Sequence, residues 1–225
     1  MSIAKIAVLA FFAASLAACA SGPKRGNGGG APIDVSSQAE RILADARKKK
    51  SDKDCMTAIP SYRVVASLGK GHDTAQYELG ACLLDANADT TTANALLRDE
   101  GFFWLRRAAY AGNARAQLAL AGALSGASGH SAAGLRPDLV EGFGWSLIYA
   151  DNAAHKLYGL PDLHPAAADH FQAQMTDAMI TDANAFAAAF QKIEMAVFTP
   201  PATARGARGQ QGQGPAGGQE RRRRR

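Results

Sequence analysis

The chain has 225 residues, 47% of them hydrophobic, which is enough for one packed domain with tails. Its net charge of +5 divides into +6 in the tail from Thr199, +2 in the first 34 residues and −3 in residues 35–198. A basic chain often binds nucleic acid. We expect no nucleic-acid partner here, because the positive charge lies outside the domain and the N-terminus carries an export signal.

Residues 1–18 have the pattern of a bacterial signal peptide. Lys5 supplies the positive charge, and the apolar run 6–16 is too short to span a membrane. The run ends in Leu-Ala-Ala-Cys at 16–19, which resembles the lipobox of bacterial lipoproteins, whose cysteine is acylated. A plain signal peptide cleaved at the Ala-x-Ala site 18–20 is the alternative.

We therefore expect Cys19 to carry the lipid anchor, since two or more acyl chains hold a protein stably on a membrane. Ala20 follows the cysteine where an aspartate would retain a lipoprotein at the inner membrane. By this resemblance the protein is expected at the periplasmic face of the outer membrane. Residues 19–34 are rich in Gly and Pro and predict a flexible tether averaging roughly 20 Å.

Helical periodicity begins after the tether and continues through residues 35–198, the predicted domain. The first two helices are expected at about 36–50 and 55–68, followed by a turn at Gly69 and Gly71.

The next part of the chain repeats itself at an offset of 41 residues. Glu100-Gly-Phe-Phe-Trp104 recurs as Glu141-Gly-Phe-Gly-Trp145, and an upstream block from Gly71 recurs from Gly112. Such a period is typical of solenoids, in which each unit buries its apolar face on its neighbour. The units cover about 72–112 and 113–153. Their helices are expected at about 74–84, 100–111, 114–124 and 138–151, with Trp104 and Trp145 in the core.

Two capping helices are expected in about 164–198, because the last unit of a solenoid needs its apolar face covered. Residues 199–225 are rich in Pro, Gly, Gln and Arg without apolar periodicity, so they are expected to be disordered.

The repeat units resemble Sel1-like repeats, which are relatives of the tetratricopeptide repeat with longer loops between helices. The likeness covers about 55–158 and is most specific at 104–116. It is carried by Ala75, Gln76, Leu79 and Gly80, then by Trp104, Leu105, Ala108, Ala109, Gly112 and Ala116. The resemblance implies an all-α fold, a short α-solenoid of helical hairpins that recruits other proteins, with no shared catalytic residues.

The expected function is thus a membrane-anchored, periplasmic scaffold that binds an unidentified envelope protein, and not an enzyme. The alternative is an envelope protein that interacts with peptidoglycan or β-lactams. Its sequence support is Ser67-Leu-Gly-Lys70, which matches the S-x-x-K pattern. Gly69 is expected to break the helix that the pattern needs, and no K-T-G or S-D-N follows.

Cys55 and Cys82 remain once Cys19 is acylated, and an even remainder in an exported chain favours a disulfide. Two buried thiols are the alternative. No metal or cofactor is expected, because CxxC pairs are absent and His164 and His170 face different sides of one helix.

Two sets of polar residues are candidate contact sites. One set is expected to face out near a junction between units and to bind an acidic partner: Arg106, Arg107, Tyr110 and Arg115. The other is expected to contact anionic lipid or peptidoglycan carboxylates through forked hydrogen bonds: Arg221, Arg222, Arg223, Arg224 and Arg225. A solvated tail is the alternative for the second set.

Overall fold

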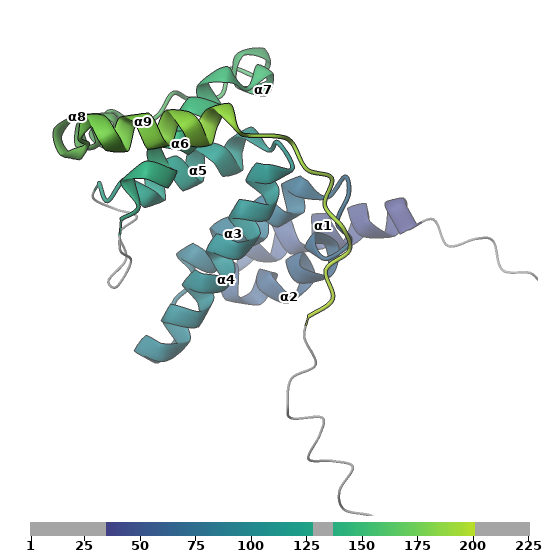
Figure 1. Ribbon diagram of the computed structural model, residues 1–225. Helices are drawn as coiled ribbons and strands as arrows, with labels where there is room; N and C mark the ends of the chain where they lie inside the picture. Colours follow the sequence, from purple (N-terminus) through teal and green to yellow (C-terminus); the bar gives the residue numbers. More distant parts are fainter. Residues whose placement is uncertain (1–34, 128–136, 201–225) are drawn as a thin grey trace, which may run out of the picture. The chain divides into compact units, whose positions relative to one another are not determined.

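A computed structural model describes residues 35–127 and 137–200, and this part of the chain is all-helical, as predicted. Its helices are α1 (Val35–Asp52), α2 (Cys55–Ala66), α3 (Asp73–Asp85), α4 (Thr91–Tyr110), α5 (Ala114–Leu124), α6 (Leu139–Asp151), α7 (Ala153–Leu157), α8 (Pro165–Gln174) and α9 (Asp177–Ala188) (Figure 1). Within the described ranges, none of these helices has the length and apolar character needed to cross a bilayer. The predicted signal peptide, the tether with Cys19 and the arginines 221–225 lie outside the described residues.

Local capping signals start most of the helices. The residue before the helix accepts a hydrogen bond from a backbone N–H of the first turn at Asp54, Thr90, Asn113, Asp138, Asn152 and Thr176. Such side chains satisfy N–H groups that have no partner inside the helix. At α6, for example, Asp138 Oδ1 accepts from the Glu141 N–H at 2.9 Å.

Each helix from α1 to α6 packs on the next one along the chain, and α9 returns to pack on α6 (Figure 1). The α3–α4 crossing is close because both helices have glycine there. A Cβ added to Gly80 would lie 2.9 Å from the carbonyl oxygen of Gly101. The two backbones therefore approach to a distance that no larger residue at Gly80 would allow.

Two clusters of buried side chains form the core. One joins α1 to α4 and includes Trp104, and the other joins α4 to α6 and includes Trp145. The two indoles are 2% and 0% exposed, which confirms the prediction that they are core residues. Each indole N–H donates to the carboxylate four residues earlier, to Glu100 at 3.2 Å and to Glu141 at 3.1 Å.

Other contacts also recur between the two predicted units. The side-chain amide of Gln76 donates to the carbonyl of Ala66 near the end of α2, and that of Gln117 donates to Ala109 near the end of α4. The glycine preceding each unit has a left-handed backbone, with φ of +77° at Gly71 and +90° at Gly112.

The structure corrects the predicted start of one helix. Helix α4 begins at Thr91 rather than near Glu100, so the loop after α3 is shorter than expected. Thr90 caps the helix, and the Asn94 side chain bonds both the N–H and the carbonyl of Ala88 at 2.7 and 3.0 Å. These bonds fold the turn back on the first helical residues and let the helix start early.

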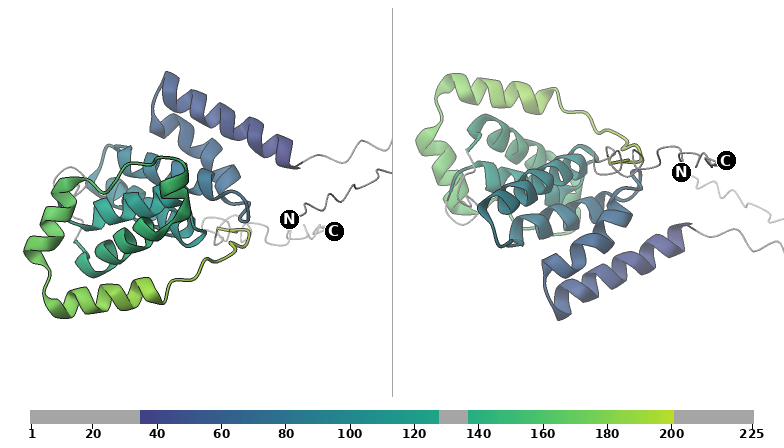
Figure 2. Two further views of the ribbon diagram at one scale, coloured as in Figure 1. Left: turned by 90° about the horizontal axis from the view of Figure 1, so that it is seen from above. Right: turned by 90° about the horizontal axis from the view of Figure 1, so that it is seen from below.

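The structure also corrects the capping helices expected across 164–198. Helix α8 ends at Gln174, and a new helix, α9, starts after the cap at Thr176. Helix α9 ends at Ala188, and residues 189–200 contain no helix. We call residues 189–200 the C-terminal strap. Figure 2 shows the strap in yellow-green running from α9 towards the blue α2 region.

Candidate functional site

The C-terminal strap is held by backbone groups at the ends of two helices. The Ile193 N–H donates to the carbonyl of Tyr110, the last residue of α4, at 2.8 Å. The Phe198 N–H donates to the carbonyl of Ser67, the C-cap of α2, also at 2.8 Å. Carbonyls at helix C-termini have no partner within their own helix, so the strap satisfies acceptors that the helices leave open.

Arg107 is the main side chain beneath the strap. Its Nη2 donates to the carbonyl of Ala196 at 2.6 Å. Its guanidinium carbon lies 5.8, 5.7 and 5.7 Å from the ring centroids of Phe103, Trp104 and Phe198, within range of cation–π attraction. Burial lowers the pKa of Arg107 below its usual range.

Phe198 anchors the far end of the strap on aromatic side chains of α4. Its ring centroid lies 5.0 Å from that of Phe103 and 5.1 Å from that of Trp104. A hollow of about 530 Å³ adjoins this contact, and Val64 and Phe103 on its wall are 52% and 39% exposed. We call the surface formed by Val64, Ser67, Phe103, Trp104 and Arg107 the aromatic groove.

Gly69 allows the strap to approach the turn between α2 and α3. Its φ is +84°, and an added Cβ would lie 2.6 Å from the carbonyl oxygens of Met195 and Ala196. Glycine is therefore required at this position for both its backbone conformation and the space it leaves. The sequence predicted the turn at Gly69 but not this contact.

The near end of the strap also rests on aromatic side chains. The Phe190 ring lies 6.2 Å from the Tyr110 ring and 5.8 Å from the Trp145 ring. Between the two aromatic ends, Glu194 pairs with Lys70 at 2.8 Å, and both side chains are largely exposed. The strap is thus fixed by the rings of Phe190 and Phe198 and by hydrogen bonds from its main chain to α2 and α4.

The four residues expected to face out and bind a partner do not form one exposed site. Arg106 makes a forked pair with Glu141, with both N–O distances at 2.7 Å. Arg107 and Tyr110 contact the strap and are half-buried, the paired Arg106 side chain is 41% exposed, and Arg115 is exposed. Contacts with residues distant in the sequence engage three of the four, and the binding of an acidic partner by these residues stays a prediction.

The Arg106–Glu141 pair connects α4 to α6. Burial would raise the pKa of Glu141, but hydrogen bonds from Arg106 and Trp145 and the charge of Arg106 lower it below its usual value. The same pairing raises the pKa of Arg106. The carboxylate therefore stays ionised and joins the two predicted units.

The predicted disulfide is present. Cys55 at the start of α2 is bonded to Cys82 in α3, with a Cα–Cα distance of 5.1 Å. Both residues belong to the first core cluster, so the bond crosslinks packed helices.

Ser67 and Lys70 do not form a catalytic pair. Ser67 is the C-cap of α2, and its hydroxyl donates to the carbonyl of Val64. The left-handed backbone at Gly69 then separates it from Lys70, which pairs with Glu194. The predicted helix break is confirmed. Over 35–127 and 137–200, no group of three His, Cys, Asp or Glu side chains is placed to hold a metal.

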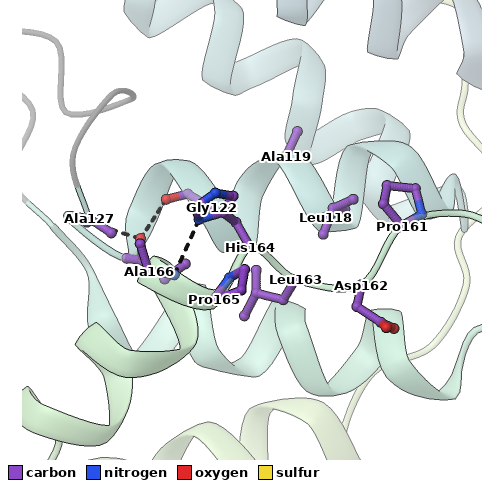
Figure 3. Close-up of a pocket in the computed structure, with 12 residues that line it drawn as sticks. Leu118, Ala119, Gly122, Ala127, Pro161, Asp162, Leu163, His164, Pro165 and Ala166 are labelled. Atoms are coloured by element: carbon purple, nitrogen blue, oxygen red, sulfur yellow. Dashed lines mark hydrogen bonds between the residues drawn. The ribbon is translucent and has the colours of Figure 1, made fainter.

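A second hollow of about 520 Å³ lies between α5 and the segment leading into α8 (Figure 3). Its wall consists mostly of apolar side chains from Leu118, Ala119, Pro161, Leu163 and Pro165.

Comparisons with known proteins identify no relative of this chain: no protein-family model, no curated protein and no solved structure matches it.

Proposed function

We propose that this protein is an envelope lipoprotein that displays Sel1-like helical repeats as a scaffold for binding another protein. The recurrence of the same contacts in both predicted units carries the proposal. Trp104 bonds Glu100 as Trp145 bonds Glu141, and a buried glutamine reaches back to the preceding helix in each unit. Repeated contacts of this kind favour an α-solenoid, an architecture that presents extended binding surfaces.

The surface of the described domain also supports a binding role. The aromatic groove exposes apolar side chains next to the guanidinium of Arg107. Aromatic residues and arginine are the side chains most enriched at the centres of protein interfaces.

The proposed location rests on the N-terminal sequence and on the disulfide. Cys19 would carry the acyl chains, and residues 19–34 would hold the domain near the outer membrane on its periplasmic side. The Cys55–Cys82 bond supports an oxidising compartment, because disulfides persist in the periplasm and are rare in the cytosol. The arginines 221–225 would add contacts to anionic lipid or peptidoglycan.

A crosslinked pull-down from membranes tests this function. The full-length protein and its Cys19→Ala variant are compared after crosslinking in intact cells. A discrete protein enriched with the anchored form, and lost with Cys19→Ala, is the expected result. Enrichment of glycan fragments without any protein would contradict the scaffold function and favour peptidoglycan binding. Equal enrichment with both forms would contradict the need for the anchor.

A further inference from the structure

The strap does not fill the surface on which it lies. The hollow of about 530 Å³ remains beside Phe198 although the Phe198 ring already lines it. Two apolar side chains of the strap, Ile193 and Val197, are 51% and 69% exposed. Among the described residues, the groove therefore keeps an apolar hollow beside Phe198, and the strap itself carries apolar side chains that face solvent.

The contacts that hold the strap are those of a site that binds an extended peptide chain. The Ser67 carbonyl accepts a main-chain N–H, and Arg107 donates to a main-chain carbonyl two residues before it. These two contacts recognise backbone and are independent of sequence. They require an extended segment, since a helix would use the same groups internally.

Two further contacts select side chains. Phe103 and Trp104 receive an aromatic ring, and Lys70 pairs with a carboxylate four residues earlier in the bound segment. Arg107 in the groove and Lys70 farther along the strap are both positively charged, which favours an acidic ligand.

We propose that the aromatic groove binds an extended peptide of a partner protein that carries an acidic residue four positions before an aromatic residue, and that the strap occupies the groove until this peptide displaces it. The proposal rests on the scaffold function and names the class of partner and the segment that regulates its access.

The contacts favour a different protein over the strap of a second copy. A second copy would offer the same contacts as the first, but the strap of the same chain competes at a high effective concentration, typically about millimolar for a short connection. Only a segment that fits better can displace it. The hollow of about 530 Å³ that the described residues leave beside Phe198 would provide additional contacts for a larger aromatic residue or further apolar neighbours.

Fluorescence anisotropy with labelled peptides tests the proposal on the full-length protein. The probes are the strap sequence 189–200, a copy with Glu194→Gln and Phe198→Ala, and a peptide that keeps only the glutamate and phenylalanine in an alanine–serine background. The protein variant Phe198→Ala removes the anchor of the strap and leaves every side chain of the groove in place. Leu157→Ala is its matched control, because Leu157 is an apolar residue of α7 that is 77% exposed and outside the strap.

We expect Phe198→Ala to bind the strap peptide and the alanine–serine peptide at least about tenfold more tightly than the wild type and Leu157→Ala do. An occupied site lowers apparent affinity by the fraction of molecules that are open. The doubly substituted peptide should lose binding, and so should the Phe198→Ala protein when Arg107→Ala is added. Should Phe198→Ala misfold, Glu194→Lys loosens the strap in a second way, by placing two cations together at Lys70.

Equal affinity of the wild type and the opened variants would overturn the proposal, as would binding that survives Arg107→Ala. A wild-type dimer that becomes monomeric with Phe198→Ala would assign the groove to a second copy and overturn it as well. These failures are distinct from failure of the scaffold function. If the pull-down identifies a partner that does not need the groove, the scaffold function stands and only this inference fails.

Discussion

Gly69→Ala is the substitution that most directly tests the position of the strap. The new Cβ would lie 2.6 Å from the main-chain carbonyl oxygens of Met195 and Ala196. Carbon and oxygen atoms in ordinary contact are about 3.5 Å apart, so the strap must move by about 1 Å. The left-handed backbone at Gly69 prevents the turn from relaxing freely instead.

The magnitude follows from the two hydrogen bonds that flank the collision. They join Arg107 to Ala196 at 2.6 Å and Phe198 to Ser67 at 2.8 Å, and a shift of about 1 Å stretches both beyond the range of hydrogen bonds. At about 0.5–1.5 kcal/mol each, their loss costs roughly 1–3 kcal/mol. The strain of a left-handed alanine adds about 1 kcal/mol.

Gly71→Ala is the matched control, because Gly71 has a φ of +77° in the same turn but no atom within 4 Å of an added Cβ. It should cost only the strain, about 1 kcal/mol. Urea unfolding gives both free energies, and limited trypsin cleavage after the exposed Lys192 reports release of the strap. Equal destabilisation and equal cleavage rates in the two variants would refute the assigned contact between strap and turn.

Two further predictions concern the crosslinks of the domain. Reduction of the Cys55–Cys82 bond, which closes a loop of 27 residues, should lower the free energy of unfolding by about 3.5 kcal/mol at 25 °C, measured by urea unfolding with and without reductant. No change on reduction would mean that the bond does not constrain the unfolded chain. Glu141→Gln should cost about 1 kcal/mol at pH 7, because it removes the charge paired with Arg106. Since the folded pKa of Glu141 is depressed below 4.5, the pair stabilises fully above the unfolded pKa and is lost as pH falls through the lower folded pKa, so the gap between variant and wild type should close in acid. A gap that does not narrow as the pH falls would contradict this origin.

Some features of the candidate site could be read from the sequence because their causes are local. The left-handed turn at Gly69 and the helix end before it follow from glycine's backbone freedom. The pairing of Cys55 with Cys82 followed from their even number and from the export signal. Neither argument could say that Gly69 faces a second segment, because that segment is more than a hundred residues away in the chain.

The error at the C-terminal end has a physical explanation. Phe186, Phe190, Ile193 and Val197 are spaced like one face of a helix, and this spacing predicted a helix to the end of the domain. The competing conformation is stabilised by groups outside the segment: the carbonyls that end α2 and α4, the Arg107 guanidinium and the rings of α4. The spacing of apolar residues carries no information about those contacts, so it could not predict that they stabilise the extended conformation more than a helix.

By itself, the sequence determined the all-helical class, the repeated pair of tryptophan helices and the glycine turns before α3 and α5. Periodicity, caps and glycines act on residues close to them in the chain. Only the tertiary structure decided that Arg106 pairs with Glu141 and Arg107 bonds the strap, where the last helix ends and which surface the strap covers. These depend on the open carbonyls, charges and rings that distant helices bring together, and a linear pattern carries no measure of that proximity.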